Sequence, residues 1–173
     1  MRSFCCRHEL CKPLNSADRG TQKASYKLIL DRQVGEFPLH EKVAMVAAGN
    51  LDTDNALTEE LSTALQSRMV HMEMTISLDD WVSWAQENKL DHRVISFIQF
   101  NPDQLYTFKP DHENKTYASP RTWEFASNLL KHVQISDPNS VNLLVGCLSP
   151  GPANTFLGYL ECFKDLPTVP EIV

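Results

Sequence analysis

The stretch VAMVAAGN, residues 43 to 50, decides how the first half of this chain is interpreted. Its first six residues, 43–48, are apolar. They lie between charged residues on one side and Gly49 and Asn50 on the other. A run of this length is too short for a typical helix, so Val43 to Ala47 is predicted to form a buried core strand. A side-chain amide at the end of such a strand costs free energy unless it finds partners. Asn50 is therefore either an ordinary turn residue or a polar group directed at a ligand.

The residues before this stretch predict a helix and a short hairpin. Residues 15–32 place apolar side chains at helical spacing, and Asn15 or Ser16 is in position to cap the helix. Residues 34–39 carry apolar side chains around a glycine and a proline, which is typical of a tight hairpin.

The residues after the stretch predict a second strand. Leucines at positions 57, 61 and 65 mark a short helix that ends near Arg68. The next segment, MVHMEMTI at residues 69–76, alternates apolar and polar residues and predicts a strand with one buried face. Strands and helices therefore alternate up to about residue 76, as they do in an α/β core.

Everything beyond Ser77 is predicted to be helical. Ser77 and Ser119 are in position to cap helices, and Pro120 suits a first helical turn. The expected helices are residues 78–88, 92–101, 120–134 and one or two more within 139–165, before a proline-containing extended tail. Six aromatic residues at helical spacing are expected in the core of this part: Trp81, Trp84, Phe97, Phe100, Trp123 and Phe125.

Composition narrows the class of protein. The chain has 173 residues, 42% hydrophobic and 22% charged, with a net charge of -6. An acidic balance argues against a general nucleic-acid binder, because phosphate neutralisation needs clustered lysine and arginine. No apolar run approaches the roughly 20 residues that span a bilayer. No apolar stretch near the N-terminus suits a signal peptide, so the expected location is the cytoplasm.

Cysteines gather near the N-terminus. Cys5, Cys6, His8 and Cys11 could supply thiolate and imidazole ligands to zinc, but their spacing departs from the usual pattern of metal-binding pairs. The simpler interpretation is a flexible tail with reduced thiols, since five cysteines, an odd number, do not form a disulfide framework. No metal site is predicted.

Three polar residues mark the ends of predicted elements. Asn50 ends the first strand, Arg68 ends the short helix, and Arg121 lies in the first turn of a later helix. An arginine at a helix C-terminus favourably meets the negative end of the helix dipole, whereas one in the first turn is locally disfavoured. Arg121 is therefore the arginine whose position more strongly suggests a functional role.

Four separated segments, in order and at suitable spacings, resemble one family. The segments YKLILDRQVGEFPLHEKVAMVAAGN, LTEELSTALQSRMVHMEM, LDDWVSWA and ASPRTWEFAS are similar to the second half of a MoxR-type AAA+ ATPase, over roughly residues 15–166. The resemblance implies that Asn50 is the sensor 1 residue, which helps to position the water that attacks the γ-phosphate. It implies that Arg68 is the arginine presented to the nucleotide of the next subunit, and that Arg121 is sensor 2, the lid arginine at the γ-phosphate.

These residue types suit phosphoryl transfer. The transition state spreads negative charge over the γ-oxygens, so catalysis relies mainly on positioning and electrostatic stabilisation. Guanidinium groups provide permanently charged donors for phosphate oxygens, and an amide orients water without acting as a base. If the resemblance holds, Asn50, Arg68 and Arg121 converge around one nucleotide.

The chain departs from the family at two motifs. None of its six glycines is followed by lysine, so the phosphate-binding loop G-x-x-x-x-G-K-[ST] is absent. Leu14 and Asn15 match the end of the second acidic motif, but Lys12 and Pro13 stand where the family has Asp-Glu. The metal-coordinating and water-activating acids thus have no counterparts, and the first residues resemble sequence at the junction of a truncated gene.

The predicted architecture is α/β, an incomplete AAA+ P-loop core followed by a small all-helical lid. The expected divisions are an atypical disordered segment at 1–14, a partial core at 15–76 and a lid at 77–173. ATP and Mg²⁺ are the cofactors that the resemblance implies, although the chain alone is expected to be inactive and could bind neither. AAA+ subunits and an unknown protein client are the implied partners.

A different class of function stays open at this stage. The chain could be a non-catalytic interaction module that associates with an intact ATPase or another partner, and a gene remnant without a selected role is a third interpretation. A sheet without its central strand would expose edge strands and apolar faces. The isolated chain is therefore predicted to be oligomeric or poorly soluble.

Overall fold

The computed structural model describes residues 14–51, 61–111, 113–133 and 137–163. The chain divides into two compact units, Met1–Glu73 (unit 1) and Met74–Val173 (unit 2). The described residues are mostly helical, and their strands form one small two-stranded sheet. The core and lid identities expected for the two parts stay predictions.

Unit 1 begins with a helix whose cap differs from the predicted one. Its elements are η1 (Leu14–Ser16), α1 (Arg19–Leu30), β1 (Gln33–Val34), β2 (Phe37–Pro38) and α2 (Thr63–Gln66). The carboxylate of Asp18 caps α1 by accepting hydrogen bonds from the backbone of Gly20 and Thr21 at 2.8 and 3.1 Å. The predicted caps, Asn15 and Ser16, lie in the preceding 3₁₀ turn, so α1 begins later than expected.

The predicted hairpin is confirmed. β1 and β2 pair antiparallel, with Gln33 opposite Pro38 and Val34 opposite Phe37. Gly35 has a positive φ of 64° in the connecting turn, a conformation that glycine adopts without steric cost.

The short helix before residue 68 is also present, as α2, although Leu57 lies outside the described residues. Ser62 caps it, and the hydroxyl of Tyr26 in α1 donates a hydrogen bond to the hydroxyl of Ser62. Leu65 is completely buried. α1 and α2 are in contact, and the Tyr26–Ser62 bond joins α1 to the cap of α2.

Both predicted core strands are wrong. Residues 43–47 and 69–76 have no strand structure, and their apolar side chains lie at the surface except for the half-buried Met69. Val46 is 87% exposed and Met74 is 95% exposed. A strand forms only when a neighbouring strand takes up its backbone hydrogen bonds, and no described segment pairs with either stretch in this way.

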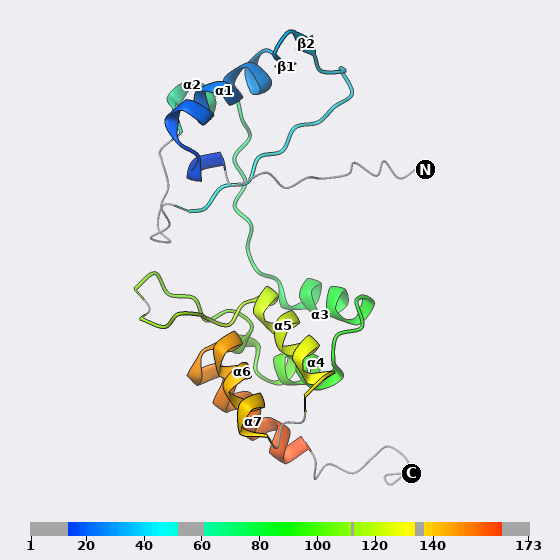
Figure 1. Ribbon diagram of the computed structural model, residues 1–173. Coiled ribbons are helices and arrows are strands. Elements are labelled where there is room, and N and C mark those ends of the chain that lie inside the picture. The colour runs from blue at the N-terminus through cyan, green and yellow to red at the C-terminus, as the bar shows by residue number, and fades with distance from the viewer. Residues whose placement is uncertain (1–13, 52–60, 112, 134–136, 164–173) are drawn as a thin grey trace. The chain divides into compact units, whose positions relative to one another are not determined.

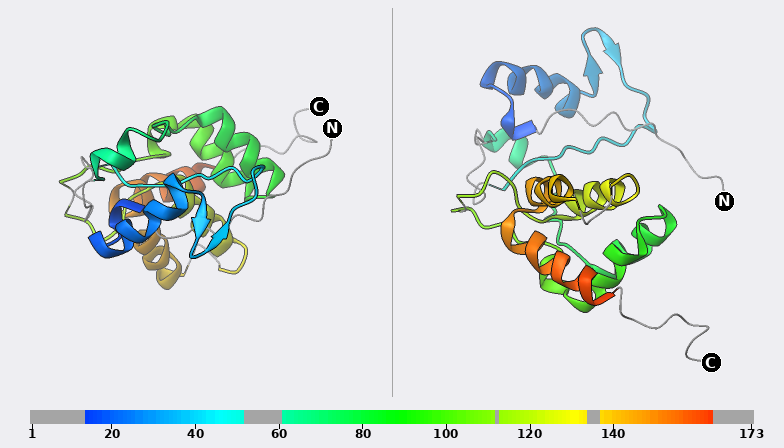
Figure 2. Two further views of the ribbon diagram at one scale, coloured as in Figure 1. Left: turned by 90° about the horizontal axis from the view of Figure 1, so that it is seen from above. Right: turned by 60° about the horizontal axis from the view of Figure 1, so that its bottom comes forward.

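Unit 2 is a packed set of helices, as predicted (Figures 1 and 2). Its elements are α3 (Leu78–Glu87), α4 (His92–Phe100), η3 (Pro102–Gln104), α5 (Pro120–Leu130), α6 (Pro138–Leu148) and α7 (Pro150–Phe163). Ser77 caps α3 by accepting from the backbone of Asp80, and Ser119 caps α5 in a reciprocal arrangement with Thr122. α6 packs against both α5 and α7.

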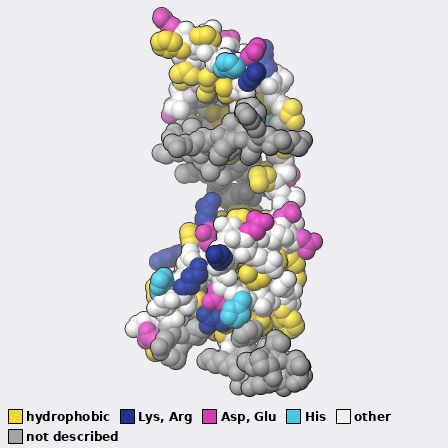
Figure 3. All heavy atoms as spheres, turned by 90° about the vertical axis from the view of Figure 1, so that its right-hand side faces the viewer, with side chains coloured by type: hydrophobic (Ala, Val, Ile, Leu, Met, Phe, Trp, Pro, Cys, Tyr) yellow, Lys and Arg dark blue, Asp and Glu magenta, His cyan; other side chains and the backbone are white. Residues whose placement is uncertain are grey.

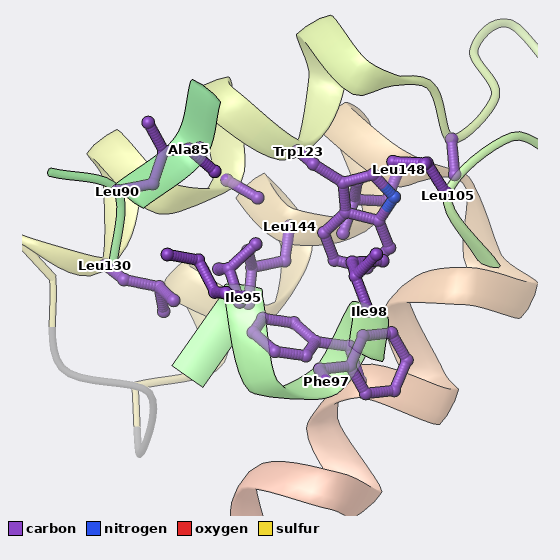
Figure 4. Close-up of a cluster of buried hydrophobic side chains, with 14 of the residues drawn as sticks. Ala85, Leu90, Ile95, Phe97, Ile98, Leu105, Trp123, Leu130, Leu144 and Leu148 are labelled. Carbon is purple, nitrogen blue, oxygen red and sulfur yellow. The ribbon is translucent and has the colours of Figure 1, made fainter. Parts of the chain in front are cut away.

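The core of unit 2 is built around three rings, two of which, Phe97 and Trp123, are labelled in Figure 4. Phe97, Trp123 and Phe156 are completely buried, with ring centroids 5.0–5.4 Å apart. Tilted and edge-on contacts of this kind add to the stabilisation from apolar burial. Trp81 is also buried, which confirms three of the six predicted core aromatics.

The other three predicted core aromatics are at the surface. Trp84 is 39% exposed, Phe125 49% and Phe100 76%. Helical spacing places all six on helices, but each helix of unit 2 buries only the narrower stripe that its neighbours cover.

Candidate functional site

Asn50 is held in place by Asn15. The side-chain amide of Asn15 donates from Nδ2 to the carbonyl oxygen of Asn50 at 2.7 Å, and its Oδ1 accepts from the Asn50 backbone N–H at 3.0 Å. Next to this pair, the Leu14 N–H donates to the carbonyl oxygen of Ala48 at 2.8 Å. The amide of Asn15 thus bonds both backbone groups of Asn50, as a neighbouring strand would. We call this arrangement the Asn15 clamp.

Gly49 allows the close approach that the Asn15 clamp requires. A Cβ atom at position 49 would lie 2.9 Å from Oδ1 of Asn15, closer than real Cβ contacts. Asn15 itself is 9% exposed, so its amide is shielded and its two hydrogen bonds replace those it would make with water. Sequence reasoning identified Asn15 only as a helix cap and as part of a motif, and missed this role.

The side chain of Asn50 faces solvent. Its Nδ2 donates to the hydroxyl of Ser16 at 3.4 Å, a long contact, and the residue is exposed. The clamp therefore fixes the backbone of Asn50 and leaves its amide accessible. The strand that was expected to present this amide is absent, and the Asn15 clamp fixes the backbone at this end of the stretch instead.

Arg68 lies directly after α2 and bonds to it. Its Nη1 donates to the carbonyl oxygen of Ala64 at 2.9 Å and to the hydroxyl of Ser67 at 3.3 Å. This is the simple role of an arginine at a helix C-terminus, where carbonyl groups lack partners within the helix. The side chain is exposed, and no described carboxylate forms a salt bridge with it.

Arg121 lies in the first turn of α5, directly after the Pro120 that begins the helix. Ser119 and Thr122 satisfy each other's backbone N–H groups there, at 3.3 and 2.7 Å. Arg121 is exposed, and it forms no hydrogen bond or ion pair with the part of the chain that the structure describes. Its charge therefore adds to the positive end of the helix dipole.

The three predicted site residues are divided between the two units. Asn50 and Arg68 belong to unit 1, where no described hydrogen bond joins them, and Arg121 belongs to unit 2. Their convergence around one nucleotide stays a prediction.

The strongest described charge pair lies elsewhere and supports the fold. Asp91 caps α4, and both its carboxylate oxygens accept from the guanidinium of Arg93, at 2.9 and 2.7 Å. Its backbone N–H donates to the buried hydroxyl of Ser127 at 2.8 Å. Burial acts to raise the pKa of Asp91, but the hydrogen bonds and charge of Arg93 outweigh burial and hold the pKa below its ordinary value of 3.8.

The described carboxylates, thiols and imidazoles form no cluster that could hold a metal ion. Among residues 14–51, 61–111, 113–133 and 137–163, no three histidine, cysteine, aspartate or glutamate side chains gather into a metal site. The proposed zinc ligands near the N-terminus lie outside these ranges. Since the phosphate loop is also absent from the sequence, we derive no hydrolytic step for this chain.

None of the described helices combines the length and the apolar character needed to cross a membrane. Comparison of the chain with family models, with curated proteins and with solved structures finds no match.

Proposed function

We propose that this chain is a MoxR-like AAA+ component that contributes arginines to a nucleotide held by another polypeptide. The observation that supports it is the state of Arg68 and Arg121. Both guanidiniums are exposed, and no described carboxylate neutralises either. Exposed guanidinium groups, which are permanently charged and can donate two parallel hydrogen bonds, are well suited to recognise phosphate oxygens.

Arg121 is the stronger part of the proposal. An arginine in the first turn of a helix is opposed by the helix dipole, by about 0.3–1 kcal/mol at an exposed site. A bound polyanion would reverse that penalty, because the guanidinium and the helix terminus would then attract the same group. Arg68 offers only part of its donors, since one nitrogen already bonds to α2.

The proposal assigns no hydrolysis to the chain alone. ATP and Mg²⁺ would be held by an intact AAA+ subunit that supplies the phosphate loop and acidic motif, and the protein client would be remodelled by that assembly. Asn50, held by the Asn15 clamp, would then face the nucleotide with its exposed amide. The proposed location is the cytoplasm.

Calorimetry with ATP tests the proposal on the chain as it is. Weak binding of ATP is expected. Arg121→Ala should weaken it at least about tenfold, because it removes a charged phosphate contact. Arg121→Lys should weaken it less, because it keeps the charge and loses only the two-pronged guanidinium geometry. Lys115→Ala is the matched control, since Lys115 is an exposed cation of the same unit. An equal loss in the control would indicate non-specific charge attraction, and no heat at millimolar ATP would contradict the proposed phosphate contact of Arg121.

A second function is favoured by a different observation. The apolar side chains of residues 43–51 and 70–76 are exposed, as expected of a non-catalytic interaction module that completes its fold on a partner. Absence of ATP binding, together with a defined complex formed through these residues, would favour this alternative over the first.

A further inference from the structure

Three aromatic rings gather in the connection between η3 and α5 of unit 2 (Figure 1). They are Tyr106, Phe108 and Tyr117, with ring centroids 4.8–6.2 Å apart, and we call them the ring cluster. None of the three belongs to the buried core around Trp123. Tyr106 is 44% exposed, and the other two are half-buried. Since apolar side chains reach the surface at several places (Figure 3), a second feature must indicate what the ring cluster binds.

The backbone holds the ring cluster outside the core. The N–H of Thr107 donates to the carbonyl oxygen of Ala118 at 2.9 Å, and the N–H of Ala118 donates to the Thr107 hydroxyl at 3.1 Å. The two ring-bearing segments therefore lie side by side. Leu105 and Ala118, which adjoin Tyr106 and Tyr117 in the chain, are buried in the core. The rings thus lie at the surface while the backbone beneath them is anchored.

Arg121 is the second feature, because it lies next to the ring cluster. It follows Tyr117 by four residues, which span at most about 14 Å even in a fully extended chain. The hydroxyl of Thr122 donates to the carbonyl oxygen of Tyr117 at 3.1 Å, so the first turn of α5 folds back toward the ring-bearing segment. The exposed guanidinium of Arg121 and the rings can therefore contact different parts of one small molecule.

The charges around the ring cluster leave Arg121 as the group that attracts an anion. Residues 109–115 contain two lysines, one aspartate and one glutamate, so their formal charges cancel with histidine neutral. Arg121 forms no ion pair with a carboxylate in the part of the chain that the structure describes. A ligand that satisfies both features has a flat ring at one end and an anionic group at the other, as a nucleotide does.

We propose that the ring cluster stacks on the base of the nucleotide whose phosphates Arg121 contacts. Aromatic side chains bind the flat face of a base, and stacking does not depend on the hydrogen-bonding edge that distinguishes one base from another. The ligand class is therefore a purine nucleoside triphosphate, without selection between adenine and guanine. This inference rests on the proposed function, because it extends the phosphate contact of Arg121 to the rest of the same ligand.

Calorimetry of the full chain with ATP, GTP and inorganic tripolyphosphate separates the two contacts. Tyr106→Ala is expected to weaken ATP and GTP binding about tenfold, because it removes a stacking ring, and to leave tripolyphosphate binding unchanged. Tyr106→Phe should keep the affinity of the original chain, because it keeps the ring. Arg121→Ala should weaken all three ligands. Trp84→Ala is the matched control, since Trp84 is a ring of similar exposure, 39%, on α3.

Nuclear magnetic resonance of the unsubstituted chain gives a second measurement that does not depend on a variant's folding. With ring-labelled tyrosine, the signals of Tyr106 and Tyr117 should shift when ATP or GTP is added, because a stacked base changes the magnetic environment of the rings. Tripolyphosphate should leave these signals in place. Circular dichroism of each variant used in calorimetry verifies that the helices remain folded.

The outcomes distinguish this inference from the proposed function. If Tyr106→Ala weakens ATP and tripolyphosphate equally, or neither, base stacking is refuted, and the phosphate contact stands where Arg121→Ala still weakens both. If Tyr106→Ala weakens the nucleotides alone while Arg121→Ala changes nothing, base stacking stands and the phosphate contact is refuted. No binding of any of the three ligands at millimolar concentration would overturn both.

Discussion

The two units place their apolar side chains in opposite environments. In unit 2 many of the large ones are internal, and Phe97 and Trp123 are completely buried. In unit 1 Leu65 is completely buried, whereas Val46 and Val70 are 87% and 88% exposed. An apolar side chain left in water contributes nothing to folding, so the contacts seen in the described part of unit 1 are mainly caps, the Asn15 clamp and local hydrogen bonds. The comparison shows that helices can complete a core within a short chain where solitary strands cannot.

The largest effect on stability is expected from a substitution that disrupts the core of unit 2. Trp123→Ala should lower the free energy of unfolding by about 3–5 kcal/mol, because it removes a buried ring and leaves the carbonyl of Gln104 without its donor. All three tryptophans lie in unit 2, so fluorescence of the remaining two during urea unfolding reports on this unit. Trp84→Ala, at a site 39% exposed, should cost less than about 1 kcal/mol. Equal costs would contradict the assigned core.

A smaller effect is expected from a substitution that removes the Asn15 clamp in unit 1. Asn15→Ala removes two hydrogen bonds to Asn50 and should destabilise that segment by about 1–3 kcal/mol. Hydrogen exchange of the Asn50 amide should accelerate about tenfold or more as a result. Ser16→Ala is the control, because Ser16 is exposed and accepts only a 3.4 Å contact. If both variants leave exchange unchanged, the clamp does not hold Asn50.

The charge pair of unit 2 predicts a pH dependence. Because the pKa of Asp91 is lower in the folded chain, its contribution is fully present above the ordinary value of 3.8 and is lost as the pH falls through the lower folded value. Asp91→Asn should lower the free energy of unfolding by about 1–2 kcal/mol at neutral pH. It should also weaken the loss of stability at acid pH (the acid limb of the stability curve), as followed by tryptophan fluorescence. Asp137→Asn, at the exposed cap of α6, should change the limb much less. Identical acid limbs in all three proteins would refute the assignment.

The smallest expected effect tests the exposed stretch of unit 1. Val46→Lys should change stability by no more than about 0.5 kcal/mol, since the side chain is 87% exposed. Leu65→Lys is the contrasting variant, because it forces a charge into a fully buried site and should abolish protection of the α1 amides in hydrogen exchange. A large loss for Val46→Lys would mean that this stretch is packed after all.

Local signals predicted the helical elements well. Ser77 and Ser119 are caps in the structure as the sequence suggests, because a serine cap acts within one helical turn. The cap of α1 was placed wrongly, since Asn15, Ser16 and Asp18 all have the required chemistry and the sequence alone does not rank them. Asn15 instead bonds a segment 35 positions away, which no local pattern reveals.

The candidate site was predicted only as residues, not as an arrangement. Asn50, Arg68 and Arg121 were singled out by their places at the ends of elements. The structure adds that the backbone of Asn50 is clamped and that Arg68 bonds to its own helix. Their relation to one another depends on contacts between distant parts of the chain, which neither spacing nor propensity encodes.

The sequence by itself determined where α3, α4 and α5 of unit 2 begin, which of their positions are apolar, and that the phosphate-binding loop is missing from it. Tertiary structure decided which aromatic rings are buried, which acid caps α1, and that the stretches at 43–47 and 69–76 are not strands. The physical reason is the location of the hydrogen-bond partner. A helix satisfies its backbone within four residues, whereas a strand depends on a neighbour that must come from elsewhere.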